Sequence, residues 1–138
     1  NLMYREEERE MLPFCQEEGI GVLPWSPLAR GRLARPWNEK SGRLESDEYG
    51  KRLYARTAAA DQAVAHAVAS VASQRGVSMA QVALAWVMQK KPVTAPIIGA
   101  SRAAHLDDAV AALSLRLTPE EIDKLEEPYL PHAIAGFR

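Results

Sequence analysis

Apolar residues recur every three or four positions in residues 58 to 75, 79 to 87 and 102 to 113, which predicts three amphipathic helices. A Glu-rich stretch over residues 6 to 18 predicts another helix, in which Pro13 either introduces a kink or delays the start. The side chains expected to face inward in the three periodic helices are Val64, Val68, Val71, Met79, Val82, Ala83, Trp86, Val87, Leu106, Val110 and Leu113.

Turn and capping residues indicate where these helices begin and end. Gly19 and Gly76 are expected to close the helices that precede them, because glycine readily adopts the left-handed conformation of a C-terminal cap. Residues 78 to 81 form a capping box, and Ser101 is expected to cap the third periodic helix. Residues 118 to 121 combine a cap, a proline and a glutamate, which predicts the start of a last helix.

Two short apolar runs, residues 20 to 25 and 94 to 99, are bounded by Gly and Pro and predict buried strands. Strands that alternate with helices indicate an α/β fold with a parallel sheet. Residues 26 to 56 show no period and are expected to form a long loop, a kind of segment that often binds ligands. Two strands are too few for a stable sheet, and the chain starts abruptly at Asn1, so we expect further protein upstream.

The end of the first predicted strand, Trp25 to Gly31, is a candidate binding site. Ligands in parallel α/β folds lie where strands end in loops. Ser26 and the backbone N–H groups that follow it can bind a phosphate oxygen, and Trp25 offers a flat face to an aromatic ring. The same spacing also fits an ordinary turn with a tryptophan in the core.

A second candidate site, Gly99 to Arg102, follows the second predicted strand and opens a helix. Helix N-terminal amides, a hydroxyl and a guanidinium together make an anion site. His105 and Asp108 lie about one and two turns further on, near the same end. A serine cap beside a solvated Arg102 accounts for this spacing equally well.

Composition excludes several classes of function. The 138 residues suffice for one domain, and 47% hydrophobic residues suffice for a core. A net charge of −1 gives no attraction to nucleic acid or to an anionic membrane. The single cysteine, Cys15, fits a reducing compartment such as the cytoplasm. The three histidines are far apart in sequence, so no metal site is expected.

Both candidate sites lie within a set of motifs that occur in a fixed order. The motifs are Asn1-Leu2, Gly19-Ile20-Gly21-Val22, Trp25 to Leu33, Ala80 to Trp86, Pro96 to Arg102 and His105-Leu106. Together they resemble the aldo-keto reductase superfamily along nearly the whole chain, most of all the branch with bacterial reductases and potassium-channel β subunits. The resemblance implies the C-terminal part of one (β/α)8 TIM barrel domain spanning residues 1 to 138. Residues 20 to 25 and 94 to 99 would be its strands 7 and 8, with their helices and a C-terminal helix.

The resemblance also implies a cofactor, NADPH. Trp25 would stack on the nicotinamide, and Ser101 with Arg102 would bind the 2′-phosphate. Ser26, Leu28 and Gly31 would hold the pyrophosphate, largely through their backbone, and His105 and Asp108 would lie against the adenosine. The full set of implied cofactor-binding residues is Trp25, Ser26, Pro27, Leu28, Arg30, Gly31, Gly99, Ser101, Arg102, His105 and Asp108.

The chain departs from the family pattern at several positions. Family members usually have Gln or Arg where His105 stands and Asn where Ala109 stands, so adenine contacts are expected to be weaker. A common Thr-Gly-Lys run is replaced by residues 34 to 36, Ala-Arg-Pro. No residue matches the family's Asp, Tyr, Lys and His tetrad, so this chain is expected to contain no catalytic residue.

Three functions are considered, of which the first two follow from this resemblance. The first is part of an NADP-dependent reductase of aldehydes or ketones, completed by the N-terminal half of the barrel, in which this chain alone would be inactive. The second is a cofactor-binding regulatory subunit similar to the channel β subunits. The third is a helical interaction domain that binds no cofactor. Titration with NADPH and an assay of carbonyl reduction would distinguish them.

Overall fold

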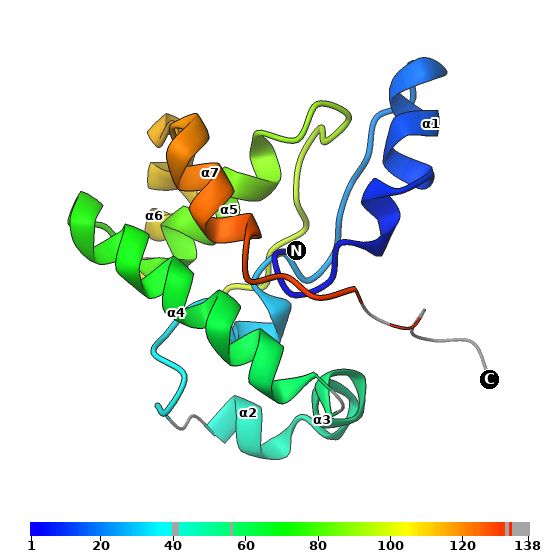
Figure 1. The fold of residues 1–138 in the computed structure, drawn as a ribbon. Helices are drawn as coiled ribbons and strands as arrows, with labels where there is room; N and C mark the ends of the chain where they lie inside the picture. The colour runs from blue at the N-terminus through cyan, green and yellow to red at the C-terminus, as the bar shows by residue number, and fades with distance from the viewer. Residues whose placement is uncertain (40–41, 56, 132, 134–138) are drawn as a thin grey trace.

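The computed structural model describes residues 1–39, 42–55, 57–131 and 133. Its centre is a pair of packed helices, α4 (Ala58–Arg75) and α5 (Met79–Met88) (Figure 1). As the spacing predicted, Val64, Val68 and Val71 of α4 are fully buried. The α5 helix buries nearly all of its residues, because it is covered on several sides. These two helices contribute most of the main hydrophobic core, which residues such as Leu2, Leu33 and Leu125 complete.

The predicted capping boxes of α5 and of α7 (Pro119–Glu126) are confirmed. Ser78 Oγ accepts from the Gln81 backbone N–H at 3.2 Å, and Gln81 Oε1 accepts from the Ser78 N–H at 3.0 Å. Thr118 and Glu121 make the same reciprocal pair at 3.3 Å and 2.8 Å. Gly76 ends α4 in the left-handed conformation, with φ of 66°, as expected of a C-terminal glycine cap.

The helix α6 (Ala103–Ala111), followed by the 3-10 turn η3 (Ala112–Ser114), packs against α5 in an unexpected orientation. Leu106, Val110 and Leu113 were expected to face inward, but they are 54%, 58% and 63% exposed. Ala112, at the start of η3, is the buried residue of this region. The predicted Ser101 cap is also wrong, because Arg102 occupies the N-cap position and makes no side-chain cap bond.

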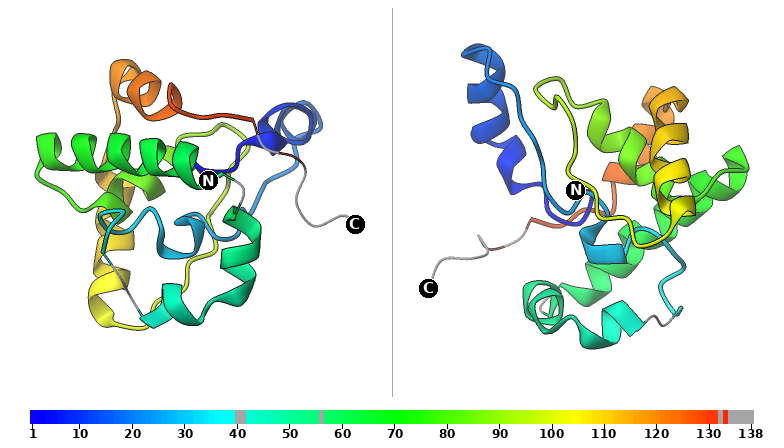
Figure 2. Two further views of the ribbon diagram at one scale, coloured as in Figure 1. Left: turned by 60° about the horizontal axis from the view of Figure 1, so that its bottom comes forward. Right: turned by 180° about the vertical axis from the view of Figure 1, so that it is seen from behind.

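The helix expected over residues 6 to 18 is divided into a 3-10 turn, η1 (Glu6–Glu8), and a short helix, α1 (Met11–Glu17). Pro13 delays the helix rather than kinking it, because it falls in the first turn, where its missing N–H is not needed. Gly19 follows with φ of 67°, as predicted. In both views of Figure 2, α1 stands apart from the other helices.

The predicted strands 7 and 8 of a (β/α)8 barrel are not found, and this fold-class prediction is wrong. Within the described residues, strand-type pairing here is limited to isolated parallel bridges, Val22 to Val93, just before the second segment, and Trp25 to Ile97. A strand needs a ladder of bonds to its neighbours, whereas these segments are joined by a few bonds of 2.8–2.9 Å. An apolar run between turn residues is therefore not sufficient to form a strand here.

The segment expected to be a long loop contains helical structure. It holds the 3-10 turn η2 (Ala29–Gly31) and the helices α2 (Gly42–Ser46) and α3 (Glu48–Tyr54). Asp47 starts α3 by accepting the Gly50 backbone N–H at 2.9 Å. Tyr54 anchors the end of α3 in the core, so this segment is held against the molecule.

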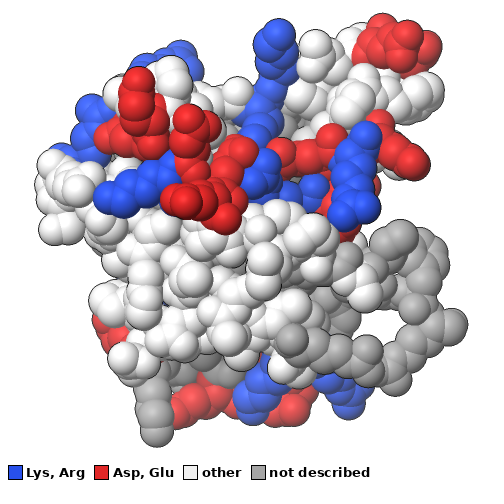
Figure 3. Space-filling model, in the orientation of Figure 1, with Lys and Arg blue, Asp and Glu red and all other residues white. Residues whose placement is uncertain are grey.

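Acidic and basic side chains are mixed on the face shown in Figure 3, and neither sign forms a continuous patch there. Both signs gather on the upper part of this face, and an uncharged band lies below them. None of the helices in the described part of the chain has the length and apolar character that a bilayer crossing requires.

Candidate functional site

The turn that follows Trp25 has an unusual backbone. Ser26, Ala29 and Arg30 have φ of 50°, 46° and 57°, a left-handed region that side chains with a Cβ rarely adopt. Gly31 follows with φ of 97°. Such strain persists only where the surroundings enforce it, and it clusters at sites that bind or react. We therefore treat residues 25–31 as the strained turn.

Several contacts hold the strained turn in place. Ala29 is fully buried in the core, and Leu28 packs against that core. The Ser26 carbonyl accepts a hydrogen bond from Asn1 Nδ2 at 3.1 Å, and Asn1 in turn lies 3.4 Å from the Tyr54 hydroxyl. Pro27 is buried as well. The backbone strain is thus balanced by packing and by hydrogen bonds to distant parts of the chain.

Arg30 leaves the strained turn and pairs with the cap of α3. Its guanidinium makes a two-pronged contact with Asp47, with Nη2 donating to Oδ1 at 2.9 Å and Nε donating to Oδ2. This hydrogen bonding holds the pKa of the Asp47 carboxyl below its usual value and raises the pKa of Arg30. The pair ties the strained turn to α3.

The Trp25 side chain is 55% exposed and borders a cavity of about 300 Å³. Its ring lies 6.4 Å from that of Tyr49, at an interplanar angle of 42°. Tyr49 is also covered by the Arg30 guanidinium, 5.4 Å from the ring centre. Ser26 and Tyr54 line the same cavity. An aromatic face beside an open cavity is suited to stacking on a flat ligand.

The second candidate segment is more exposed than the first. Gly99, Ser101, Arg102 and His105 are all exposed, and the Ser101 backbone N–H donates to His105 Nδ1 at 3.4 Å. Asp108 is half-buried, and its Oδ1 accepts from Gln81 Nε2 at 3.0 Å. The Arg102 and His105 side chains therefore lie open to solvent, while Asp108 is held by α5.

The parts of the chain that lead into the two candidate segments lie side by side. The backbone N–H of Ile97 donates to the Pro24 carbonyl at 2.9 Å, next to the bridge between Trp25 and Ile97. The structure thus joins the strained turn to the segment that leads to Arg102. It does not join either segment to His66, which is exposed on α4.

The sequence interpretation missed three residues that contact the candidate site. Tyr49 faces Trp25, Asp47 binds Arg30, and Gln81 binds Asp108. The signal for Asp47 was its place before a helix start, where Asp is a favoured cap. No local signal marks the other two contacts, because their partners are distant in sequence.

A polar cluster outside the candidate site joins the N-terminal segment to α5 and α7. Glu126, in the last turn of α7, accepts hydrogen bonds from side chains of the other segments. The donors are Arg5 Nη2 at 2.6 Å, Lys90 Nζ at 2.7 Å and Trp86 Nε1 at 2.8 Å. Lys90 also lies 4.4 Å from the centre of the Trp86 ring. All of these groups serve to bind segments together.

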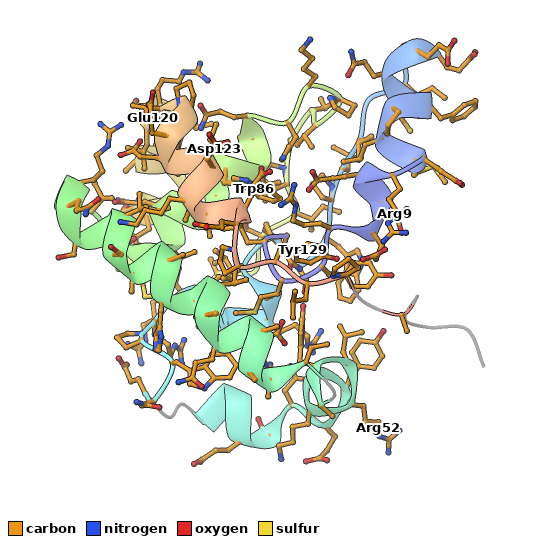
Figure 4. All side chains as sticks on the ribbon, in the orientation of Figure 1. Arg9, Arg52, Trp86, Glu120, Asp123 and Tyr129 are labelled. Atoms are coloured by element: carbon orange, nitrogen blue, oxygen red, sulfur yellow. The ribbon has the colours of Figure 1, made fainter. Side chains whose placement is uncertain are left out.

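Glu8 and Tyr129 complete the polar cluster. Burial tends to raise the pKa of Glu8, but hydrogen bonds from Arg5 and charge from Lys90 outweigh it, and the pKa is lowered. The Tyr129 hydroxyl accepts from the Arg5 backbone N–H at 3.1 Å and donates to Glu6 at 2.5 Å. Figure 4 shows Trp86 near the end of α7 and Tyr129 in the segment that follows. Within the described residues, no group of His, Cys, Asp and Glu side chains converges to hold a metal ion.

Comparison with known proteins identifies the class. The model of the aldo/keto reductase family matches residues 1–129. The versiconal hemiacetal acetate reductase of Aspergillus parasiticus is 47% identical over 136 residues, which are 97% of this chain and 39% of that protein. A putative aryl-alcohol dehydrogenase of Saccharomyces cerevisiae is 46% identical over 132 residues, 95% of this chain and 38% of that protein.

A solved structure agrees with this match. A crystal structure of a thermostable aldo-keto reductase with the inhibitor epalrestat is similar at a TM-score of 0.64 and 25% identity, covering 93% of this chain and 37% of that one. The chain therefore belongs to the aldo/keto reductase family, an oxidoreductase class. It spans less than half the length of these relatives. None of the relatives named here bears the name of a channel subunit, so the predicted branch receives no support.

Proposed function

We propose that this chain is the NADP(H)-binding part of an aldo-keto reductase that reduces aldehydes or ketones. The observation that carries the proposal is the strained turn, in which left-handed backbone at Ser26, Ala29 and Arg30 lies directly after an exposed Trp25 beside a cavity. Strained backbone of this kind is typical of ligand-binding turns. The family membership of the chain supports the same conclusion.

The proposed cofactor contacts are divided between the two candidate segments. Trp25 stacks on the nicotinamide ring, and the backbone of the strained turn holds the pyrophosphate. Arg102, which is exposed and carries a full positive charge, binds the 2′-phosphate together with Ser101. When bound, the nicotinamide supplies a hydride to the substrate carbonyl carbon. No catalytic acid is assigned to this chain.

The substrate class follows from the relatives. One relative is named for the reduction of a hemiacetal acetate and another for aryl alcohols. We propose a small carbonyl substrate for the whole protein, and that residues 1 to 138 form one part of a single domain. The cavity beside Trp25 and Tyr49, with its aromatic lining, suits a flat ligand.

Fluorescence titration of the full-length protein with NADPH tests the proposal. Trp25 fluorescence is expected to be quenched by a stacked nicotinamide, so Trp25→Leu removes the quenching at saturation. The control is Trp37→Phe, which removes a half-buried tryptophan outside the proposed site. Saturable quenching that survives in Trp25→Leu, or an absence of binding in the wild type, would overturn the assignment.

Arg102→Ala tests the proposed 2′-phosphate contact. Its affinity for NADPH is expected to fall about tenfold or more, because a charge-assisted bond is lost, whereas affinity for NADH stays nearly unchanged. Isothermal titration with both cofactors measures the difference. An equal loss for the two cofactors would show that Arg102 does not bind the 2′-phosphate.

A further inference from the structure

The Gln81 side chain links the start of α5 to α6 with both ends of its amide. Oε1 accepts the Ser78 backbone N–H at 3.0 Å, which completes the capping box. Nε2 donates to Asp108 Oδ1 at 3.0 Å, across 27 positions of sequence. A residue that only capped α5 would need the oxygen alone. The hydrogen bond from the amide nitrogen to Asp108 therefore has a role other than capping α5.

The helix α6 has little else to fix its rotation. Among its described residues none is buried, and Leu106 and Val110 face solvent. Asp108 and Ala109 are the half-buried residues of this helix, and apolar contact such as that of Ala109 is not directional. A hydrogen bond favours a narrow range of angles. Among the described residues, the bond between Gln81 and Asp108 is thus a directional restraint on how α6 is turned about its axis.

The rotation of α6 matters because this helix carries the second candidate segment. Arg102 is its N-cap and His105 lies in its first turn. The segment before it is fixed to Pro24 by the Ile97 hydrogen bond, at the start of the strained turn. A turn of α6 would therefore move Arg102 and His105 relative to a fixed strained turn.

We infer that Gln81 is a positioning residue for the adenosine end of the cofactor, and that it acts through Asp108. This inference rests on the proposed function, because it needs a cofactor that reaches Arg102. This inference changes the role expected for Asp108, because its Oδ1 accepts a hydrogen bond from Gln81. Asp108 holds α6 in place, and Arg102 makes the contact with the 2′-phosphate.

Gln81→Glu separates positioning from capping in the full-length protein. Glutamate keeps the oxygen that accepts the Ser78 N–H, so the capping box survives. It replaces the donor with a carboxylate that faces Asp108, and like charges repel. Affinity for adenosine 2′,5′-bisphosphate is expected to fall about tenfold, while affinity for nicotinamide mononucleotide stays within about twofold.

The double variant Gln81→Glu/Asp108→Asn restores the bond in the opposite direction. The asparagine amide donates to the new carboxylate, so affinity for the bisphosphate is expected to return to within about twofold of the wild type. The matched control is Glu121→Gln, a Glu/Gln exchange at the same position of the capping box of α7. It is expected to leave the affinity for both fragments unchanged.

Calorimetric titration with each fragment and a thermal melt of each variant decide the outcome. An undiminished affinity in a folded Gln81→Glu protein would overturn the inference, as would equal losses for both fragments or an absence of rescue. If the single variant does not fold, the double variant decides: wild-type affinity supports the inference and weaker affinity overturns it. A wild type that binds neither fragment would instead overturn the proposed function.

Discussion

The Asp47 carboxylate has two structural roles, because it caps α3 and also binds Arg30 of the strained turn. We expect Asp47→Ala to lower the free energy of unfolding by about 1–2 kcal/mol, most of it from the lost cap. Asp47→Asn keeps an oxygen for the Gly50 N–H and loses only the charge, so its cost is expected to be smaller. Urea unfolding of both variants measures the difference.

The lowered pKa of Asp47 predicts that the stability of the protein depends on pH. Arg30 lowers the folded-state pKa of Asp47 below the unfolded value of about 3.9. The stabilisation is therefore complete above about pH 5, and it is lost as pH falls below the unfolded-state pKa and through the lower, folded-state pKa. In Asp47→Asn this contribution is absent, so its melting temperature is expected to approach that of the wild type on acidification. A difference in melting temperature between the two proteins that stays constant down to pH 2 would contradict this.

At the scale of single residues, the sequence predicted the features that depend on residues close to one another along the chain. The capping boxes at Ser78 and Thr118 involve residues three positions apart, so their pattern is visible in the sequence. The left-handed backbone at Ser26 and Ala29 was not predictable. It is enforced by contacts with distant residues such as Asn1, which no local pattern records.

At the scale of elements, Glu126 holds α7 to α5 and to the N-terminal segment. In Glu126→Ala, the cations of Arg5 and Lys90 and the indole N–H of Trp86 lose their common acceptor. The side chain is 22% exposed, so we expect a loss of about 2–3 kcal/mol in the free energy of unfolding. The control is Glu127→Ala at the exposed neighbouring position, for which a change within about 0.5 kcal/mol is expected in urea unfolding. Equal effects of the two variants would refute the role of the cluster.

Helices were predicted better than strands because their bonds are local. The period of Val64, Val68 and Val71 located α4, since an α-helix satisfies its own backbone. A strand depends on partners elsewhere in the chain, and in the part that the structure describes residues 20 to 25 make isolated bridges in place of a ladder. The periodicity of α6 was also read correctly as helix, but the pattern did not indicate that its apolar stripe faces solvent.

At the scale of the whole molecule, the motifs indicated the family correctly. The barrel strands that the same resemblance implied, and the parallel sheet that the element pattern predicted, are not found in the described residues. Motifs such as Trp25 to Leu33 are recognised by order and identity, so they do not require the segments to pair as strands. The packing of the helices depends on the complete set of long-range contacts. The exposure of Leu106 and Val110 on α6 depends on these contacts.

The outward apolar surface predicts that the 138-residue chain, expressed alone, self-associates. Large apolar side chains are exposed on α1, in the segments at Leu23 and Ile97, and on α6. Exposed apolar area of this kind drives association, because its burial removes it from water. Sedimentation velocity is expected to show larger species as concentration rises, and the double variant Leu106→Lys/Val110→Lys is expected to reduce them without a large loss of stability. Ala111→Lys adds a charge at another exposed position of the same helix, and it should reduce association much less. A monomer at every concentration, or an equal effect of the control, would show that the α6 stripe is not the surface that associates.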